Sequence, residues 1–169
     1  MTTTPDTPEH ILTTTTLEDR GSLIQAGDEA PNFTLSDQDR GEWTLAEHLK
    51  NGDVLLCFFP FAFTGVCSTE MACLSKELAE AEKSGVTAVG ISGDSFASLK
   101  AWADQEGFSH RLLSDSHRAV CKAYGLYWSE LNVARRGTVL IGKDGRVKWS
   151  QSREPGEGMN WDEVQAKMS

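Results

Sequence analysis

The apolar run from Val54 to Phe59 constrains the fold more than any other stretch of the sequence. An unbroken run of this length is typical of a strand covered on both faces, as in the centre of a sheet between two layers of helices. Pro60 follows directly, and proline lacks the N–H that a central strand needs. Thr64 is a suitable N-cap for a helix that begins just after it. The stretch therefore predicts a central strand that leads through a short loop into a helix.

The rest of the sequence alternates between strand and helix patterns. We expect further strands at 86–92 and 112–113, with hairpins at 32–43 and at 138–142 with 146–151, where Asp-Gly supplies the turn. Helices are expected through Leu49, from Cys67 onward, before Gly107, at 119–124 and at 160–167. This order predicts an α/β domain with a thioredoxin-like fold, whose mixed, mostly parallel central sheet is flanked by helices on both faces.

Length and charge exclude several classes of protein. The chain has 169 residues and a net charge of −9, with no basic cluster to neutralise phosphates, so a nucleic-acid partner is not expected. No apolar segment reaches the roughly 18 residues that span a bilayer, and the threonine-rich start does not resemble a signal peptide, so we expect a cytoplasmic protein without a membrane partner. Residues 1–24 are expected to form a flexible N-terminal arm and residues 25–169 a single domain.

The four cysteines are spaced as individual thiols. Cys57, Cys67, Cys73 and Cys121 fit neither a zinc half-site nor a repeating disulfide pattern, so no metal or cofactor is expected. Cys57 lies within the apolar run and is expected in the core. The four histidines show no metal-binding spacing and are expected at the surface.

Cys67 stands out because it falls in the first turn of the predicted helix. The positive end of the helix dipole favours a thiolate there. Making the thiolate the main form at neutral pH takes roughly 3.4 kcal/mol of stabilisation, whereas a helix end supplies only about 0.3 to 1 kcal/mol. A cation from elsewhere in the chain must therefore supply most of the rest.

Three motifs are similar to those of one enzyme family. They are Pro60-x-x-x-Thr64-x-x-Cys67, Gly27-x-x-Ala30-Pro31-x-Phe33-Thr34-Leu35 and Arg136-Gly137-Thr138. They resemble the motifs of the peroxiredoxins, and residues 58–70, 123–125 and 155–157 are most similar to the one-cysteine alkyl hydroperoxide reductase E group. The resemblance implies a homodimeric, thiol-dependent peroxidase without a cofactor. Such an enzyme reduces hydrogen peroxide and organic hydroperoxides through a Cys67 sulfenic acid, which a thioredoxin-like protein or a low-molecular-weight thiol then reduces.

The resemblance also implies roles for individual residues. It places Arg136 beside the sulfur, and its neighbour Arg135 is expected to point to the opposite face of the strand. The Thr64 hydroxyl is expected to hold the peroxide in line with the sulfur. Pro60 is expected to shield the thiolate, although it can also simply end the strand. Glu70 shares a helix face with Cys67, so it either orients the arginine or lies in solvent.

The residues leave other mechanisms open. Cys73 or Cys121 is a possible resolving cysteine, which would make the enzyme an atypical two-cysteine peroxiredoxin. A thioredoxin-like disulfide carrier is an alternative, but Thr64 stands where a C-x-x-C motif needs its first cysteine. A cysteine hydrolase would need a histidine such as His48 or His117 beside Cys67, and no spacing supports that pairing. No sequence feature requires a non-catalytic holdase.

Overall fold

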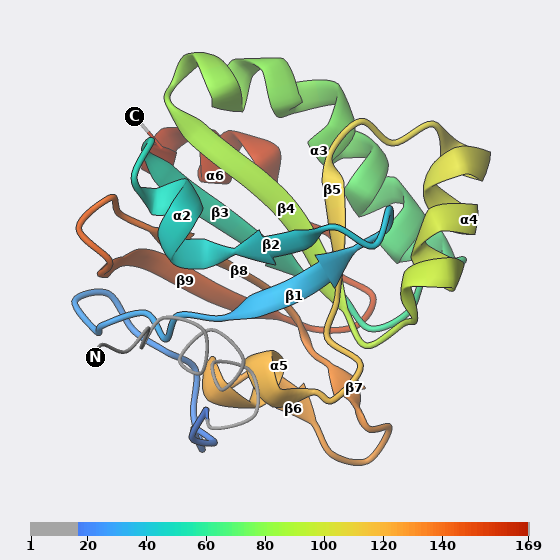
Figure 1. The fold of residues 1–169 in the computed structure, drawn as a ribbon, viewed down its shortest axis with the longest axis horizontal. Coiled ribbons are helices and arrows are strands. Elements are labelled where there is room, and N and C mark those ends of the chain that lie inside the picture. The colour runs from blue at the N-terminus through green and yellow to red at the C-terminus, as the bar shows by residue number, and fades with distance from the viewer. Residues whose placement is uncertain (1–16, 169) are drawn as a thin grey trace, which may run out of the picture.

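A single seven-stranded sheet forms the centre of the computed structural model, which describes residues 17–168 (Figure 1). The strand order is β2-β1-β5-β4-β3-β8-β9, and β6 and β7 form a separate hairpin. The strands are β1 Thr34–Asp37, β2 Glu42–Thr44, β3 Asp53–Phe58, β4 Val86–Ser92, β5 Arg111–Ser114, β6 Tyr127–Trp128, β7 Val133–Ala134, β8 Arg136–Ile141 and β9 Val147–Arg153. The helices are α2 Leu45–Leu49, α3 Gly65–Lys83, α4 Phe96–Glu106, α5 Ala119–Ala123 and α6 Trp161–Met168.

The sheet is mixed, but parallel pairing does not dominate it. Strand β3 pairs in parallel with β4, which pairs in parallel with β5. The other pairings, β1 with β2, β1 with β5, β3 with β8 and β8 with β9, are antiparallel. The expectation of a mostly parallel sheet is therefore wrong. The two hairpins extend the parallel centre on either side, and each adds a strand that joins the centre in the antiparallel sense.

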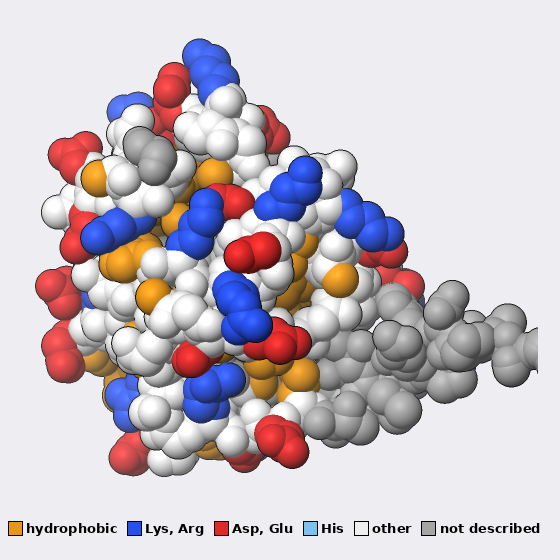
Figure 2. Space-filling model, turned by 90° about the vertical axis from the view of Figure 1, so that its left-hand side faces the viewer, with side chains coloured by type: hydrophobic (Ala, Val, Ile, Leu, Met, Phe, Trp, Pro, Cys, Tyr) orange, Lys and Arg blue, Asp and Glu red, His pale blue; other side chains and the backbone are white. Residues whose placement is uncertain are grey.

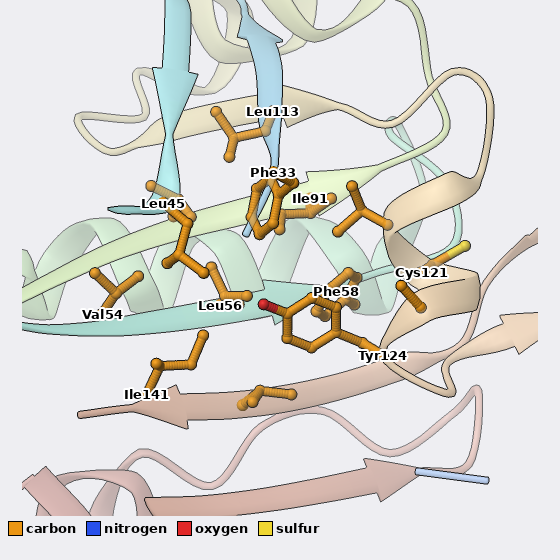
Figure 3. Packing of buried hydrophobic residues seen from close by; sticks show 14 of the residues in the cluster. Phe33, Leu45, Val54, Leu56, Phe58, Ile91, Leu113, Cys121, Tyr124 and Ile141 are labelled. Carbon is orange, nitrogen blue, oxygen red and sulfur yellow. The ribbon is translucent and has the colours of Figure 1, made fainter. Parts of the chain in front are cut away.

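The apolar run lies at the middle of the sheet. Its side chains contribute to two hydrophobic cores, because successive strand side chains point to opposite faces. Val54, Leu56 and Phe58 pack with residues of α2 and α5, and Figure 3 shows Phe58 beside Tyr124 and Leu56 below Leu45. Leu55, Cys57 and Phe59 pack with residues of α3, α4 and α6 on the other face. The expectation of a central strand covered on both faces is confirmed.

The helix that carries Cys67 packs closely on the sheet. Gly90 of β4 makes this possible, since a Cβ at this position would lie 2.7 Å from the Met71 sulfur and 2.9 Å from Leu112 Cδ2. The next helix, α4, ends before Gly107 as expected, and Gly107 adopts a left-handed conformation with φ 73°. At the start of α4, the Ser95 side chain accepts a hydrogen bond from the Ser98 N–H. Both helices contribute to the same core cluster and so lie on the same face of the sheet.

The chain before residue 25 belongs partly to the folded unit. Residues 1–16 of the predicted arm lie outside the described residues. The Arg20 N–H donates to Lys122 O and the Ile24 N–H to Tyr124 O, at 2.9 and 3.1 Å, and Ile24 is completely buried. This segment, which precedes the expected boundary at residue 25, therefore lies beside the C-terminal end of α5 and packs into the same core cluster.

The surface shows no continuous field of one charge on the face seen in Figure 2. Lysine and arginine side chains alternate there with aspartate and glutamate. A surface of this kind lacks the basic stripe with which proteins follow a phosphate backbone. Within residues 17–168, none of the helices is both long enough and apolar enough to cross a membrane.

Candidate functional site

Cys67 is the third residue of α3, and its side chain faces the sheet. The helix starts at Gly65, so the cysteine lies in the first turn, where the helix dipole favours negative charge. Cys67 has 0% of its surface exposed and packs in the core cluster that contains Cys57 and Phe59. A buried sulfur at this position is shielded from bulk water, so the few charged groups around it dominate its surroundings.

Thr64 occupies the N-cap position but does not cap the helix with its side chain. Its hydroxyl donates instead to the Phe61 carbonyl at 2.8 Å, back into the loop. The expected hydrogen bond from the helix N–H groups to this hydroxyl is therefore absent. Because the cap is missing, the N–H groups of the first turn stay available to an incoming oxygen. Thr64 itself is exposed.

Arg136, the first residue of β8, connects the sulfur to a carboxylate. Its Nη2 donates to the Cys67 sulfur at 3.2 Å, and its Nη1 donates to Glu70 Oε1 at 2.9 Å. Its Nε donates to the Pro155 carbonyl at 3.0 Å, so the guanidinium is fixed on three sides. Arg136 is 4% exposed, whereas the neighbouring Arg135 is exposed, as the alternation of strand side chains requires.

Glu70 is buried between two arginines rather than solvated. Besides its pair with Arg136, its Oε2 accepts a hydrogen bond from Arg153 Nη2 at 2.7 Å. Arg153 also donates through Nη1 to the Thr138 hydroxyl at 2.9 Å and to Gln151. The alternative of a surface glutamate is wrong, because the Glu70 side chain has no exposed surface.

Arg153 was not among the residues singled out from the sequence. It lies on β9 directly opposite Arg136 on β8, and paired residues of antiparallel strands project from the same face. The signal in the sequence was the hairpin itself, since its register brings a second arginine next to the first. Extending both predicted strands of the hairpin by two residues away from the turn would have paired Arg136 with Arg153.

The charges of this buried cluster balance only when the sulfur is ionised. Two guanidinium groups and one carboxylate leave a net charge of +1 if Cys67 carries its proton. Loss of that proton brings the total to zero. An uncompensated charge is costly in a buried environment, so a negative charge placed beside Arg136 would be compensated by this cluster. This favourable balance adds to the helix dipole and the direct hydrogen bond from Arg136.

Pro60 is buried at the point where β3 ends, and the loop that follows leads to Thr64. The N–H of the preceding Phe59 donates to Ile91 O at 3.0 Å, which is the last contact of this strand with β4. Proline at the next position cannot continue that ladder. The loop therefore leaves the sheet at Pro60 and passes over the first turn of α3.

The remaining cysteines differ from Cys67 in their surroundings, and all four are free. Cys57 is completely buried, as expected for a core position, and burial raises the pKa of its thiol, with Glu70 adding to the rise. Cys73 is partly buried on α3, where burial also raises its pKa. Cys121 lies in the core cluster on the other face of the sheet from Cys67, and burial and then the Asp115 carboxylate raise its pKa.

The expectation that all histidines lie at the surface is wrong for His110. This residue is 2% exposed, and burial lowers its pKa to about 4. Its Nδ1 lies 2.9 Å from Ser75 Oγ and its Nε2 lies 3.3 Å from the Met71 sulfur. None of the histidines in residues 17–168 makes a hydrogen bond to Cys67, and this part of the chain holds no group of three or more side chains suited to a metal ion.

Comparison with known sequences places the chain in a well-populated group. Residues 26–150 match the AhpC/TSA family. Alkyl hydroperoxide reductase E of Mycobacterium tuberculosis is 39% identical over 137 residues, which cover 80% of this chain and 90% of that protein. Peroxiredoxin Bcp of Escherichia coli K12 is 34% identical over 132 residues, which cover 74% of this chain and 83% of that protein.

Solved structures agree with the sequence comparison. The reduced 2-Cys peroxiredoxin of Plasmodium vivax superimposes with a TM-score of 0.80 at 30% identity, covering 86% of this chain and 80% of that chain. Peroxidoxin BcpB of Mycobacterium tuberculosis gives a TM-score of 0.79 at 27% identity, covering 86% of this chain and 96% of that chain. The thioredoxin-like fold expected from the sequence is confirmed.

Proposed function

The chain belongs to the AhpC/TSA family of peroxiredoxins and is a thiol-dependent peroxidase, and we propose that Cys67 is the residue that attacks the peroxide. The observation that carries this proposal is the hydrogen bond of 3.2 Å from Arg136 Nη2 to the Cys67 sulfur, within a cluster that is neutral only with a thiolate. A thiolate is the nucleophilic form of cysteine.

The reaction consists of one displacement at oxygen. The Cys67 thiolate attacks the terminal oxygen of a hydroperoxide, so that an S–O bond forms while the O–O bond breaks. Cysteine is oxidised to a sulfenic acid, and the leaving oxygen takes a proton and departs as water or an alcohol. Arg136 donates to the sulfur before the attack and remains positioned to donate to an oxygen beside it during the attack.

Thr64 and the first turn of α3 are proposed to hold the substrate. The Thr64 hydroxyl is exposed, and the helix N–H groups that it leaves uncapped point toward the same side. The N–H groups are donors suited to a peroxide oxygen, and the Thr64 oxygen, whose own proton goes to the Phe61 carbonyl, can accept from the peroxide O–H. A fixed peroxide with its O–O bond in line with the sulfur reacts faster. Pro60 contributes by ending the strand and keeping water from the buried sulfur.

Glu70 and Arg153 are proposed to act through Arg136. The carboxylate receives one hydrogen bond from each arginine, so it fixes the Arg136 guanidinium plane against the sulfur. Arg153 supplies the positive charge that compensates Glu70. Without it, the carboxylate would neutralise Arg136 and disfavour a second negative charge on the sulfur.

The positions of the cysteines support a one-cysteine mechanism with an external thiol. Cys73 lies on the same helix as Cys67, and six residues of helix separate two Cα atoms by about 9 Å, beyond the reach of a disulfide. Cys121 is on the opposite face of the sheet. The sulfenic acid then condenses with an external thiol, releasing water and forming a mixed disulfide that a second thiol reduces. The reductant is a thioredoxin-like protein or a low-molecular-weight thiol.

The substrates that fit this chemistry are hydrogen peroxide and alkyl hydroperoxides, in keeping with the name of the mycobacterial relative. We further propose a cytoplasmic setting, since a protein with four free cysteines is typical of a reducing compartment. Association into a homodimer would cover some of the exposed large apolar side chains, which include Phe61, Phe63, Phe96 and Leu131.

Consumption of hydroperoxide in the presence of a thiol tests the proposal. Cys67→Ser is expected to abolish turnover, because serine is not ionised at neutral pH and is a much weaker nucleophile than a thiolate. Cys57→Ser and Cys121→Ser serve as controls and should keep the reaction. Hydroperoxide consumption that persists in Cys67→Ser would contradict the assignment.

A further inference from the structure

The loop between Pro60 and α3 contains a strained residue. Phe63 has φ 64°, a left-handed conformation that is rare for a bulky side chain and costs about 1 to 3 kcal/mol. Phe63 is 50% exposed, and its ring lies beside the Trp102 ring, with centroids 6.2 Å apart. Thr64 follows directly, so the backbone of Phe63 determines where the Thr64 hydroxyl lies. Contacts elsewhere in the loop must hold this conformation.

The carboxylate of Asp94 provides such a contact. Asp94 Oδ2 accepts a hydrogen bond from the Ala62 N–H at 2.9 Å, across 32 positions of sequence. We propose that Asp94 is a positioning residue for the peroxidase reaction: it holds Ala62, thereby keeps Phe63 left-handed, and so places the Thr64 hydroxyl over Cys67. This inference rests on the function proposed above for Cys67 and Thr64.

Asp94 is itself held rigidly at the end of the sheet. The Ser92 hydroxyl, at the end of β4, donates to the same Oδ2 at 2.6 Å and accepts from the Asp94 N–H at 3.2 Å. Ser92 is completely buried. The Ser114 hydroxyl, at the end of β5, donates to the Asp94 carbonyl at 2.7 Å. Asp94 therefore joins the loop to two neighbouring strand ends, which hardly move relative to one another in a packed sheet.

The two halves of the site are held separately. The arginine is fixed against the sulfur by Glu70 and by the Pro155 carbonyl. The hydrogen bonds of Asp94 go to Ala62, Ser92 and Ser114, and within residues 17–168 none of them reaches Cys67 or Arg136. Loss of Asp94 should therefore displace the peroxide-binding side and leave the thiolate intact. A residue that only stabilises the fold would not separate the two.

Two reactions of the Cys67 thiol distinguish a displaced peroxide-binding side from a changed thiolate. Iodoacetamide requires the Cys67 thiolate, whereas a hydroperoxide also requires Thr64 in place. In Asp94→Ala, the rate of Cys67 sulfenic acid formation, quenched with dimedone and measured by mass spectrometry, should fall about tenfold or more, while alkylation at the same pH changes by less than about twofold. Asp94→Asn keeps an oxygen that can accept from Ala62 and Ser92, so it should react at close to the wild-type rate.

Ser95→Ala is the matched control, because it removes the α4 cap next to Asp94 without touching the loop, and both of its rates should match the wild type. An unchanged peroxide rate in Asp94→Ala would overturn the inference, as would peroxide and alkylation rates that fall by the same factor. If Asp94→Ala does not fold, Ser92→Ala, which removes the donor that fixes the carboxylate, is judged by the same criterion. Wild-type protein that forms no Cys67 sulfenic acid would instead contradict the proposed function itself.

Discussion

Single residues from three elements meet around the sulfur that we propose to react. Cys67 and Glu70 come from α3, Arg136 from β8 and Arg153 from β9. The helix end contributes about 0.3 to 1 kcal/mol to a negative charge in its first turn, and Arg136 adds a direct hydrogen bond to the sulfur. The guanidinium group suits this role, because its fork of donors reaches the sulfur and the carboxylate together.

Arg136→Lys tests whether the site needs a guanidinium group that donates to Glu70 and to the Cys67 sulfur at the same time. Lysine keeps the charge but acts as a point donor, so it cannot hold Glu70 and the Cys67 sulfur in one plane. Loss of one hydrogen bond to a charged group costs about 1.5 to 3 kcal/mol, which predicts a fall of about 10- to 160-fold in the rate of sulfenic acid formation. The exposed neighbour provides the control, and Arg135→Lys should leave the rate unchanged. A wild-type rate in Arg136→Lys would show that charge alone is sufficient.

The charge balance of the cluster predicts a compensating pair of substitutions. Arg153→Gln leaves Glu70 with one cation, so the protein should lose about 3 kcal/mol of stability and Cys67 should react more slowly with iodoacetamide at pH 7. The double variant Glu70→Gln/Arg153→Gln removes one charge of each sign and leaves Arg136 with the thiolate. It should be more stable and alkylate faster than the single variant, as measured by urea unfolding and mass spectrometry. If the double variant has the same alkylation rate and the same stability as Arg153→Gln, the charges of Glu70 and Arg153 do not compensate each other.

The sequence predicted this site in part. Cys67, Arg136 and Glu70 follow from a motif and from helix spacing, and the contacts expected among them are present. Arg153 was missed because its position depends on the register of β8 with β9, which the residues near Cys67 do not encode. The Thr64 hydroxyl was expected to cap the helix, but the loop turns it toward Phe61 instead.

Among the elements, α3 packs close enough to the sheet to place Cys67 against it, because Gly90 of β4 has no side chain. The limits of β4 and the C-terminal end of α4 were predicted closely, since their signals are local: an apolar run and a terminal glycine. The direction in which strands pair was predicted less well. That choice depends on where the hairpins dock against the parallel centre, which is a contact between distant parts of the chain.

Gly90→Ala tests the packing of α3 on the sheet. The added Cβ would meet the Met71 sulfur, Leu112 and Phe59 at 2.7 to 3.2 Å in a filled core, so we expect a loss of about 1 to 3 kcal/mol in the free energy of unfolding. Urea denaturation measures it. Gly21→Ala is the control, because a Cβ there meets nothing within 4 Å. Equal stabilities for the two variants would show that α3 has room to shift.

At the scale of the whole molecule, a buried histidine couples stability to pH. His110 joins β5 to α3 through Ser75 and Met71, and burial holds its folded pKa at about 4, below the value of about 6.5 for an unfolded chain. Between these values the unfolded chain binds the extra proton. Stability is therefore full above about pH 6.5 and falls as the pH is lowered toward 4, by up to about 3 kcal/mol from this group.

His110→Gln should remove much of this dependence. Urea unfolding at pH 7 and at pH 4.5 gives the loss of stability on acidification, which we expect to be smaller in His110→Gln than in the wild type. His117 is exposed and provides the control, so His117→Gln should behave as the wild type. An identical loss in all three proteins would show that other groups cause the acid sensitivity.

We propose that Cys67 is oxidised alone and that an external thiol restores it. The most direct test treats the reduced protein with one equivalent of hydroperoxide, traps the product with dimedone and maps it by mass spectrometry. The positions of the cysteines predict a dimedone adduct on Cys67, with Cys57, Cys73 and Cys121 still reduced. A disulfide from Cys67 to Cys73 or Cys121, or an adduct on a cysteine other than Cys67, would contradict it.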